Sequence, residues 1–422
     1  MSEIYVEKSN RLEGTVQVSG SKNAVLPLLA ATLLTDEPCV LGGVPELKDV
    51  DVMCKLLQCF GADVKEDYEN AQINVHAKTI KTNTAPAGLV KAMRASIVAM
   101  GPLLARTGGI EVSLPGGCAI GDRPIDLHIK GFRSLGATIK MEDTEGEGSY
   151  VKAEAGKLKG AEMYLDFASV GATENIMMAA VLAEGTTIIE NPAQEPEIVD
   201  LANFLNKMGA KIRGAGTDMI RIEGVEKLHG AEHVVIPDRI EAGTFMIAAA
   251  ITGGNILIEN MLPNHVVPVI AKLRETGVYV REAFSGLNVD ATRGMLSATN
   301  IKTLPYPGFP TDIQPQFMAF LATVEGSSTI IETVFENRFM HIDELNLMNA
   351  GIESDGRRAT IPGGAVLKGA NVRATDLRAG VALILAGMAA SGRTVISDVH
   401  HIDRGYENIT GKLKLLGANI WR

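Results

Sequence analysis

Cysteine, aromatic side chains and long apolar segments are all scarce in this sequence of 422 residues. Its four cysteines are Cys39, Cys54, Cys59 and Cys118, and they include no Cys-x-x-Cys pair, which argues against a zinc or thioredoxin-like site. So few thiols in a chain of this size are typical of a reducing compartment. The longest apolar runs, such as residues 379–390, are too short to span a bilayer. We therefore expect a soluble cytoplasmic protein that does not associate with membranes.

An excess of basic residues is also absent. The chain carries a formal net charge of −10 at pH 7 and has no stripe of lysine and arginine, so nucleic-acid binding is not expected. Its residues are 46% hydrophobic but only 5% aromatic, and 44 of them are glycine. This composition indicates tightly packed small and branched side chains, as in an α/β protein of two or three domains.

A short glycine-containing phrase recurs along the chain, each time after an amphipathic stretch and before a strand-like one. This placement is typical of a glycine that ends a helix. The successive glycines are 75, 73, 68, 74 and 66 residues apart, which indicates an internal repeat of six units. The repeated glycines are Gly61, Gly136, Gly209, Gly277, Gly351 and Gly417.

Each unit also contains a helix that is apolar nearly all round. Such a helix has to be buried on every side, so we expect helices inside and strands outside, the reverse of an ordinary barrel. Units of strand, apolar helix, strand, amphipathic helix and strand predict two inverted α/β barrel domains, residues 22–236 and residues 1–21 with 237–422. The predicted apolar helices cover residues 24–34, 95–104, 175–182, 243–251, 317–324 and 379–389.

The repeat defines a common position thirteen residues before each of these glycines. Four of the six residues there are basic, and three of them lie in polar loops. We interpret them as anion-binding groups gathered on one rim of each domain; the alternative is a repeat that simply favours a surface cation at this position. The six residues are Lys48, Arg123, Pro196, Asn264, Arg338 and Arg404.

Charged residues also stand at the predicted starts of the apolar helices. Lys22, Arg94 and Arg378 oppose the helix dipole there, which favours a role in binding phosphates or carboxylates. Asp312 and Asp376 occupy the same position in the last two units, where an aspartate is also an ordinary helix cap. For Asp376, the sequence favours neither a functional role nor a helix cap over the other. A functional role is favoured for Asp312, because two prolines and a glycine present it on a rigid turn.

The segment of residues 113–124 contains three glycines and two prolines, so neither helix nor regular strand is expected there. It places Cys118 five residues before Arg123. A single cysteine usually has a packing role, and we assign that role to the other three, which fall in predicted strand or helix. Cys118, on a glycine-rich loop, is instead a candidate proton donor or nucleophile beside an anion.

Two other segments look like motifs but do not fit the chemistry that they suggest. Residues 20–23 read Gly-Ser-Lys-Asn, and asparagine stands where a Walker motif requires serine or threonine. His400 and His401 are adjacent, so we expect their rings to point apart and to make a poor metal site. The sequence therefore predicts no metal.

Taken together, several segments resemble the family of UDP-N-acetylglucosamine 1-carboxyvinyltransferases, enolpyruvyl transferases of the EPSP synthase superfamily. The resemblance covers essentially the whole chain. The sister family that makes 5-enolpyruvylshikimate 3-phosphate lacks the Pro-Gly-Gly-Cys sequence of residues 115–118, so Cys118 favours the nucleotide-sugar family. The segments that carry the resemblance are residues 20–24, 94–96, 114–128, 169–173, 309–312, 336–341, 374–379 and 401–406.

The resemblance implies a reaction in which phosphoenolpyruvate and UDP-N-acetylglucosamine form an enolpyruvyl ether on the sugar 3′-hydroxyl and phosphate leaves. It implies that Lys22, Arg123 and Arg404 bind phosphoenolpyruvate. It further implies that Cys118 protonates the methylene carbon and is the target of the epoxide fosfomycin, and that Asp312 takes part in deprotonation. No cofactor is implied, and we expect a monomer.

The resemblance also implies a wider set of substrate-binding residues, some of which complete a cleft between the two domains. Two alternatives remain: an enolpyruvyl transferase for a phosphorylated cyclic acid, and a non-catalytic protein that binds nucleotide sugars. The implied substrate-binding residues are Lys22, Asn23, Lys48, Arg94, Arg123, Pro124, Ile125, Asp126, Leu127, Ser169, Val170, Gly171, Asp312, Val334, Arg338, Asp376 and Arg378.

Overall fold

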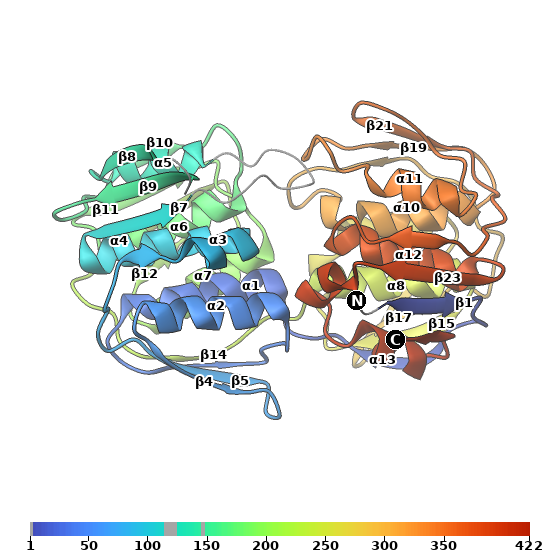
Figure 1. Ribbon diagram of the computed structural model, residues 1–422, viewed down its shortest axis with the longest axis horizontal. Helices are drawn as coiled ribbons and strands as arrows, with labels where there is room; N and C mark the ends of the chain where they lie inside the picture. The colour runs from blue at the N-terminus through green and yellow to red at the C-terminus, as the bar shows by residue number, and fades with distance from the viewer. Residues whose placement is uncertain (1–2, 114–124, 145–147) are drawn as a thin grey trace. The chain divides into compact units, whose positions relative to one another are not determined.

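The computed structural model describes residues 3–113, 125–144 and 148–422 (Figure 1). The chain divides into two compact units. The N-terminal unit runs from residue 20 to residue 236 apart from the undescribed segments, and the C-terminal unit combines residues up to 19 with residues 237–422. Among the described residues, no helix is both long enough and apolar enough to cross a membrane.

In the described part of the chain, the strands form six four-stranded sheets, three in each unit, and all six have the same topology. The first two strands of each sheet are parallel, and the remaining pairs are antiparallel. The sheets of the N-terminal unit are β14 (Glu232–Val234), β3 (Cys39–Gly42), β5 (Gln72–His76), β4 (Asp63–Asp67); β6 (Thr84–Ala85), β7 (Gly109–Ser113), β9 (Gly148–Glu154), β8 (Thr138–Thr144); and β10 (Glu162–Tyr164), β11 (Thr186–Glu190), β13 (Met219–Glu223), β12 (Lys211–Arg213).

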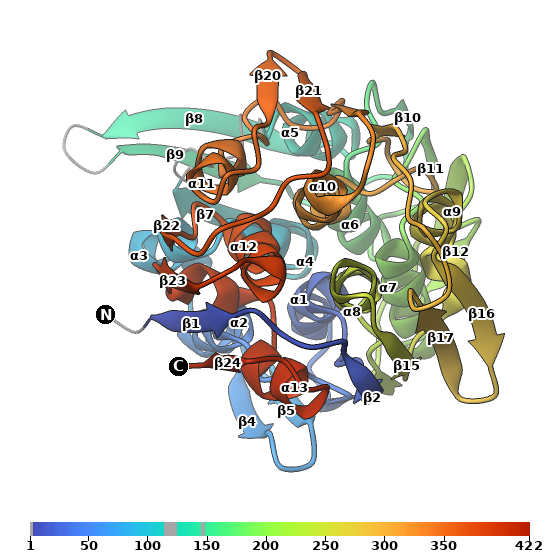
Figure 2. The same ribbon diagram turned by 90° about the vertical axis from the view of Figure 1, so that its right-hand side faces the viewer.

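The C-terminal unit takes strands from both ends of the chain. Its first strand pairs with its last, and Figure 2 shows them side by side. The sheets of this unit are β2 (Glu13–Gln17), β15 (Asn255–Glu259), β17 (Gly286–Asp290), β16 (Tyr279–Ala283); β18 (Ile301–Lys302), β19 (Ser328–Ile331), β21 (Arg358–Ile361), β20 (Glu353–Asp355); and β22 (Asn371–Arg373), β23 (Arg393–Ser397), β1 (Ile4–Glu7), β24 (Ile420–Trp421).

The apolar helices lie inside the sheets, as the sequence predicts. In the C-terminal unit, α8, α10 and α12 pack against one another at the centre of the strands (Figure 2). The side chains along these helices are buried on nearly every face, which removes their apolar surface from water. The inner helices are α1 (Lys22–Ala31), α4 (Met100–Thr107), α6 (Val170–Ala180), α8 (Arg239–Thr252), α10 (Gln314–Thr323) and α12 (Leu377–Ala389).

A second helix follows in each unit. In five units it ends two residues before the predicted glycine, which has a positive φ, from 92° at Gly136 to 104° at Gly61, a region that side chains disfavour. This confirms the helix-ending role of these five glycines. In the fifth unit the prediction is wrong: the helix ends at Leu347, and the left-handed residue that follows it is Asn349, with a φ of 71°, rather than Gly351. The second helices are α2 (Lys48–Cys59), α5 (Asp126–Ser134), α7 (Pro196–Lys207), α9 (Val267–Glu275), α11 (His341–Leu347) and α13 (Ile409–Leu415).

The repeating unit has one strand more than the sequence predicts, because a hairpin replaces the single strand after the second helix. In the third unit, Gly214 and Gly216 turn β12 into β13 with φ values of 82° and 86°. Shorter helices complete the elements: α3 (Ala87–Ala92) and the 3₁₀ turns η1 (Thr32–Leu34), η2 (Arg94–Ala99), η3 (Pro263–His265), η4 (Thr311–Ile313) and η5 (Val399–Arg404).

The second unit departs from one continuous inner helix, since η2 precedes α4 there. Gly101, in the first turn of α4, lies against Asn175 of α6, whose Oδ1 accepts a hydrogen bond of 2.7 Å from the Gly101 amide. A Cβ atom at position 101 would lie 2.3 Å from the backbone oxygen of Asn175. Only glycine therefore permits this close approach of two inner helices.

We predict that Gly101→Ala lowers the free energy of unfolding by about 1–3 kcal/mol, because the backbone of α6 cannot move away as a side chain could. Gly88→Ala is the matched control, since a Cβ on this exposed helical glycine meets nothing within 4 Å. It should leave stability unchanged or raise it by up to about 1 kcal/mol. Urea unfolding of both variants tests this; equal stabilities would contradict it.

Candidate functional site

The residues expected to form the site belong to both units, and each group is described here within its own unit. Cys118, Arg123 and Pro124 lie outside the described residues. The N-terminal unit contains Lys22, Asn23, Lys48, Arg94, residues 125–127 and residues 169–171. The C-terminal unit contains Asp312, Val334, Arg338, Asp376, Arg378 and Arg404.

Lys22 is the first residue of α1, where the helix dipole disfavours a cation. Its ammonium group lies 2.8 Å from Asp49 Oδ2, and side-chain exposures of 12% for Lys22 and 4% for Asp49 show that the pair is largely buried. Asp49 offsets the unfavourable position of the cation. It follows Lys48, the first residue of α2, so the same turn carries the basic residue of the repeat register and the acid that pairs with Lys22.

His128 connects three of the segments that the sequence singles out in this unit. Burial, together with the positive charge of Arg94, lowers the pKa of His128 to about 4, so the ring is neutral near pH 7. Its Nδ1 lies 2.8 Å from Asn175 Nδ2, an amide donor, and therefore accepts this hydrogen bond. Gly171 lies on the other side, where a Cβ would be 3.3 Å from His128 Cε1.

The two predicted binding segments of this unit, residues 125–127 and 169–171, each lie at the start of a helix. Ser169 caps α6 by accepting a hydrogen bond of 3.4 Å from the amide of Ala172. Ile125 stands directly before α5, and Asp126 is the first residue of that helix. The structure therefore brings the starts of α5 and α6 to His128, while Arg94 begins η2.

Asp312 is held between two arginines in the C-terminal unit. Its Oδ1 accepts from Arg338 Nη2 at 3.0 Å, and its Oδ2 accepts from Arg378 Nε at 3.2 Å and Nη2 at 3.0 Å. The arginine side chains are buried, with exposures of 2% and 3%, but the Asp312 side chain remains 26% exposed. The guanidinium groups thus support the carboxylate from inside, and solvent can still reach it.

The surroundings of Arg378 favour its charged form. Burial by itself would lower the pKa of Arg378, but Asp312, Tyr406 and Asp238 together outweigh burial and raise it above the ordinary value. The guanidinium carbon lies 5.3 Å from the centre of the Tyr406 ring. The Tyr406 hydroxyl is bonded to Thr244 at 2.8 Å and to Gln316 Nε2 at 3.1 Å, so α8, α10 and the residues after η5 fix this wall of the site.

Asp376 has the capping role that one of its two interpretations predicts. Its Oδ1 accepts from the amides of Arg378 at 2.9 Å and Ala379 at 3.2 Å, at the start of α12. His341, at the start of α11, is fully buried nearby, and burial lowers its pKa to about 4. The last two predicted residues of this unit lie outside its strands. Arg404 is the last residue of η5. Val334 donates its backbone amide to Glu332 Oε1 at 2.8 Å.

Two sequence-based expectations are wrong. Cys39 and Cys54 are buried, but Cys59 is exposed, because it is the last residue of α2 and the neighbouring Phe60 takes the buried position. The rings of His400 and His401 do not point apart: their centroids are 4.1 Å apart. Both residues belong to the 3₁₀ turn η5, where successive side chains do not alternate between opposite faces as in a strand.

Comparison with known proteins places the chain in a family. The model of the EPSP synthase (3-phosphoshikimate 1-carboxyvinyltransferase) family matches residues 6–413. A UDP-N-acetylglucosamine 1-carboxyvinyltransferase 1 from Caldanaerobacter subterraneus is 59% identical, over 100% of this chain and 99% of the relative. A UDP-N-acetylglucosamine 1-carboxyvinyltransferase 2 from Carboxydothermus hydrogenoformans is 56% identical with the same coverage. The chain belongs to the UDP-N-acetylglucosamine 1-carboxyvinyltransferase family.

Solved structures agree with this membership. The enolpyruvyl transferase NikO from Streptomyces tendae has a TM-score of 0.89 and 26% identity, over 99% of this chain and 98% of that one. An EPSP synthase from Acinetobacter baumannii has a TM-score of 0.76 at 20% identity, over 100% and 99% of the two chains, which shows a common fold. The inverted α/β architecture is therefore that of the enolpyruvyl transferases.

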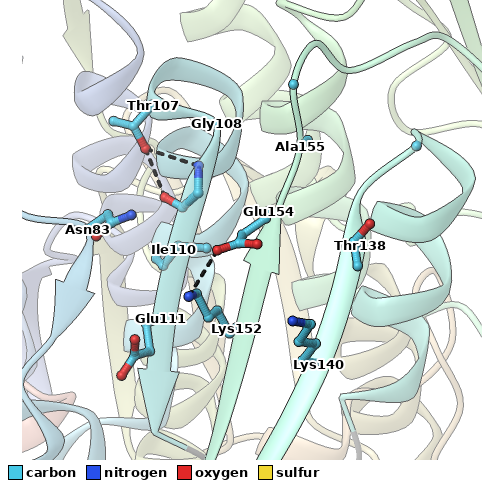
Figure 3. Close-up of a pocket in the computed structure, with 13 residues that line it drawn as sticks. Asn83, Thr107, Gly108, Ile110, Glu111, Thr138, Lys140, Lys152, Glu154 and Ala155 are labelled. Carbon is cyan, nitrogen blue, oxygen red and sulfur yellow. Dashed lines mark hydrogen bonds and ion pairs between the residues drawn. The ribbon is translucent and has the colours of Figure 1, made fainter.

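A separate hollow of about 620 Å³ lies on the outer face of the sheet that contains β7, β8 and β9. Figure 3 shows its charged side chains, with Lys152 paired to Glu154 at 2.9 Å. None of the residues that the family resemblance assigns to substrate lines this hollow. Two lysines and two glutamates line this hollow, so their charges cancel, whereas around Asp312 two arginines face one carboxylate.

Sequence reasoning missed Asp49, His128 and Glu332, whose side chains contact or adjoin the predicted site residues. Asp49 was detectable, because it follows a residue of the repeat register. His128 lies within a segment that carries the family resemblance. Glu332 accepts from the nearby amides of Val334 and Phe335, but its other two partners, at positions 303 and 311, are distant in sequence and were not predictable.

We predict that Asp312→Asn lowers the free energy of unfolding by about 3 kcal/mol or somewhat less, since it leaves two buried guanidinium groups without their anion while the site stays partly solvated. Asp355→Asn, at an exposed position of β20, should change stability by less than about 0.5 kcal/mol. Chemical denaturation at pH 7 compares them, and a neutral Asp312→Asn substitution would show that the arginines do not depend on this carboxylate.

Proposed function

We propose that this chain transfers the enolpyruvyl group of phosphoenolpyruvate to the 3′-hydroxyl of UDP-N-acetylglucosamine and releases phosphate, a first step toward peptidoglycan precursors. The observation that carries the proposal is the partly exposed carboxylate of Asp312, supported by the buried Arg338 and Arg378. Identities of 54–59% to proteins with this activity in their names, over the whole chain, support it further.

The reaction is an addition followed by an elimination, and it requires an acid that protonates phosphoenolpyruvate and a base that deprotonates the sugar hydroxyl. In the addition, Cys118 gives a proton to the methylene carbon of phosphoenolpyruvate, and the sugar hydroxyl attacks the adjacent carbon as Asp312 takes its proton. In the elimination, phosphate leaves with the proton that Asp312 accepted. Asp312 then takes one proton from the new methyl group, and this proton returns through solvent to the Cys118 thiolate. Positioned acid and base groups of this kind contribute roughly 10²- to 10⁴-fold to a rate.

The geometry around Asp312 suits its role as the base that accepts the proton of the sugar hydroxyl. Two guanidinium groups fix the direction of the carboxylate, so its exposed side can meet a hydroxyl without prior reorganisation. The role of Cys118 rests on the family resemblance, because Cys118 lies outside the described residues. A thiol that has to stay reduced is compatible with a reaction in the cytoplasm, where we place it.

The anionic groups of both substrates require cations. We assign Lys22, Arg123 and Arg404 to phosphoenolpyruvate, and Asn23, Arg94 and the chain around residues 125–127 and 169–171 to the nucleotide sugar. The ion pair with Asp49 supports this role for Lys22, since it offsets the cost of placing an ammonium group at a helix start. Neutral His128 adds no charge between Arg94 and a diphosphate and can offer one N–H donor.

We predict that purified protein releases phosphate from phosphoenolpyruvate only when UDP-N-acetylglucosamine is present, because the acceptor hydroxyl is needed for the ketal. A phosphorylated cyclic acid such as 3-phosphoshikimate is the matched alternative acceptor, chosen because the family model carries that name. Colorimetric phosphate determination measures both reactions. Phosphate release with 3-phosphoshikimate alone, or binding of both substrates without release, would refute the proposed activity.

We predict that fosfomycin labels Cys118 and that Cys118→Ser abolishes turnover, whereas Cys118→Asp retains part of the activity and escapes labelling because its carboxyl can still carry a proton. Cys59 is the competing thiol, since it is exposed, while burial raises the pKa of Cys39 and Cys54. Peptide mass mapping in a Cys59→Ser background removes this ambiguity. A label on another cysteine would contradict the assignment of the proton donor.

A further inference from the structure

Glu332 occupies a position at which the other described units turn the chain differently. In five units, the amide that follows the first parallel strand donates to the last carbonyl of the neighbouring strand, and this bond identifies equivalent residues. The bonds join Val235 to Gly42, Leu165 to Glu190, Val18 to Glu259, Thr303 to Ile331 and Ala374 to Ser397. The residue after each acceptor is Gly43, Asn191, Asn260, Glu332 and Asp398, respectively.

Four of these five residues have positive φ, between 52° and 68°. Glycine, asparagine and aspartate are the residues that most readily adopt this left-handed conformation. Glu332 is the exception: it does not have positive φ, and the residue is only 1% exposed. The fifth unit has therefore exchanged a left-handed turn residue for a buried carboxylate.

The carboxylate of Glu332 receives four hydrogen bonds. Oε1 accepts from the hydroxyl of Thr303 at 2.8 Å and from the amides of Val334 at 2.8 Å and Phe335 at 3.2 Å. Oε2 accepts from the hydroxyl of Thr311 at 2.9 Å. Four is about the number that an ionised carboxylate can accept, so buried donors compensate its charge.

Three of these four donors, all but Thr303, come from the two segments that carry the site. Thr311 directly precedes Asp312 in η4. Phe335 follows Val334, and its ring lies 5.8 Å from the guanidinium carbon of Arg338, which in turn donates to Asp312. Glu332 is therefore connected to Asp312 in two ways. One connection runs through Thr311, which precedes Asp312. The other runs through Phe335, whose ring lies beside Arg338.

We infer that Glu332 is a positioning residue, which sets the direction of the Asp312 carboxylate through Thr311 and the place of the Val334 amide through its own Oε1. The inference rests on the proposed function, because it treats Asp312 as the base and Val334 as part of the nucleotide-sugar site. It adds a group that touches neither substrate and that determines how both residues meet them.

The bond to Thr311 can be removed without touching Glu332. Thr311→Val replaces the hydroxyl by a methyl group of similar shape, and Thr311→Ser keeps the hydroxyl. A misplacement of about 1 Å in a reacting group costs about 100-fold in rate, so we expect kcat of Thr311→Val to fall by a factor of 10 to 100. KM for phosphoenolpyruvate should change less than about threefold, and Thr311→Ser should restore kcat to within about threefold of the parent.

Glu332→Ala tests the second arm. It removes the oxygen that accepts from the Val334 and Phe335 amides, whereas glutamine would keep one such oxygen, so we expect a lower kcat together with a several-fold higher KM for UDP-N-acetylglucosamine. Glu190→Ala is the control, because Glu190 is an exposed residue that ends the corresponding strand β11 in the third unit. Its kinetic constants should equal those of the parent, and thermal melting of every variant shows how much protein is folded at the assay temperature.

The outcomes separate the two proposals. An inactive parent protein would overturn the proposed function and this inference with it. An active parent with equal kcat values for Thr311→Val and Thr311→Ser, or with losses that match the unfolded fraction, would overturn the positioning role alone. A fall in kcat for Thr311→Val with rescue by Thr311→Ser, in folded protein, supports it.

Discussion

The fold depends on one constraint: six inner helices are apolar on nearly every face and have to be removed from water on all sides. A sheet on one face of such a helix is not sufficient, so three small sheets surround the helices of each unit. The polar parts of the repeat are then left at the ends of the helices and in the turns after the strands. Those positions carry Lys22, Arg94, Asp312 and Arg378.

Charges of opposite sign meet in these turns. Lys22 is paired with Asp49 in one unit, and Asp312 lies between two arginines in the other. Buried histidines nearby are kept neutral by burial, which lowers the pKa of both His128 and His341 to about 4. The site therefore keeps its ionic character in a few directed contacts, which suits a reaction between two anionic substrates and a developing phosphate.

Periodicity made most of the fold predictable. The glycine spacing located five of the six helix ends, and the apolar stretches located the inner helices, because both features depend on local backbone and burial preferences. In the fifth unit an asparagine, Asn349, takes the left-handed position instead. Details that depend on neighbours were not predictable. Cys59 is exposed because Phe60 fills the core beside it, and the extra hairpin strand depends on pairing with a strand from elsewhere in the unit.

The sequence by itself determined the six-unit repeat, the inverted arrangement of helices and strands, the family, and the chemical types placed at each helix start. Only the tertiary structure decided which of these groups act together. Asp312 meets Arg338 and Arg378 across 26 and 66 residues, and Glu332 meets Thr303 and Thr311 across 29 and 21. Such contacts arise because sheets and helices bring distant turns together, and a side chain's direction in those turns has no signature in the neighbouring residues.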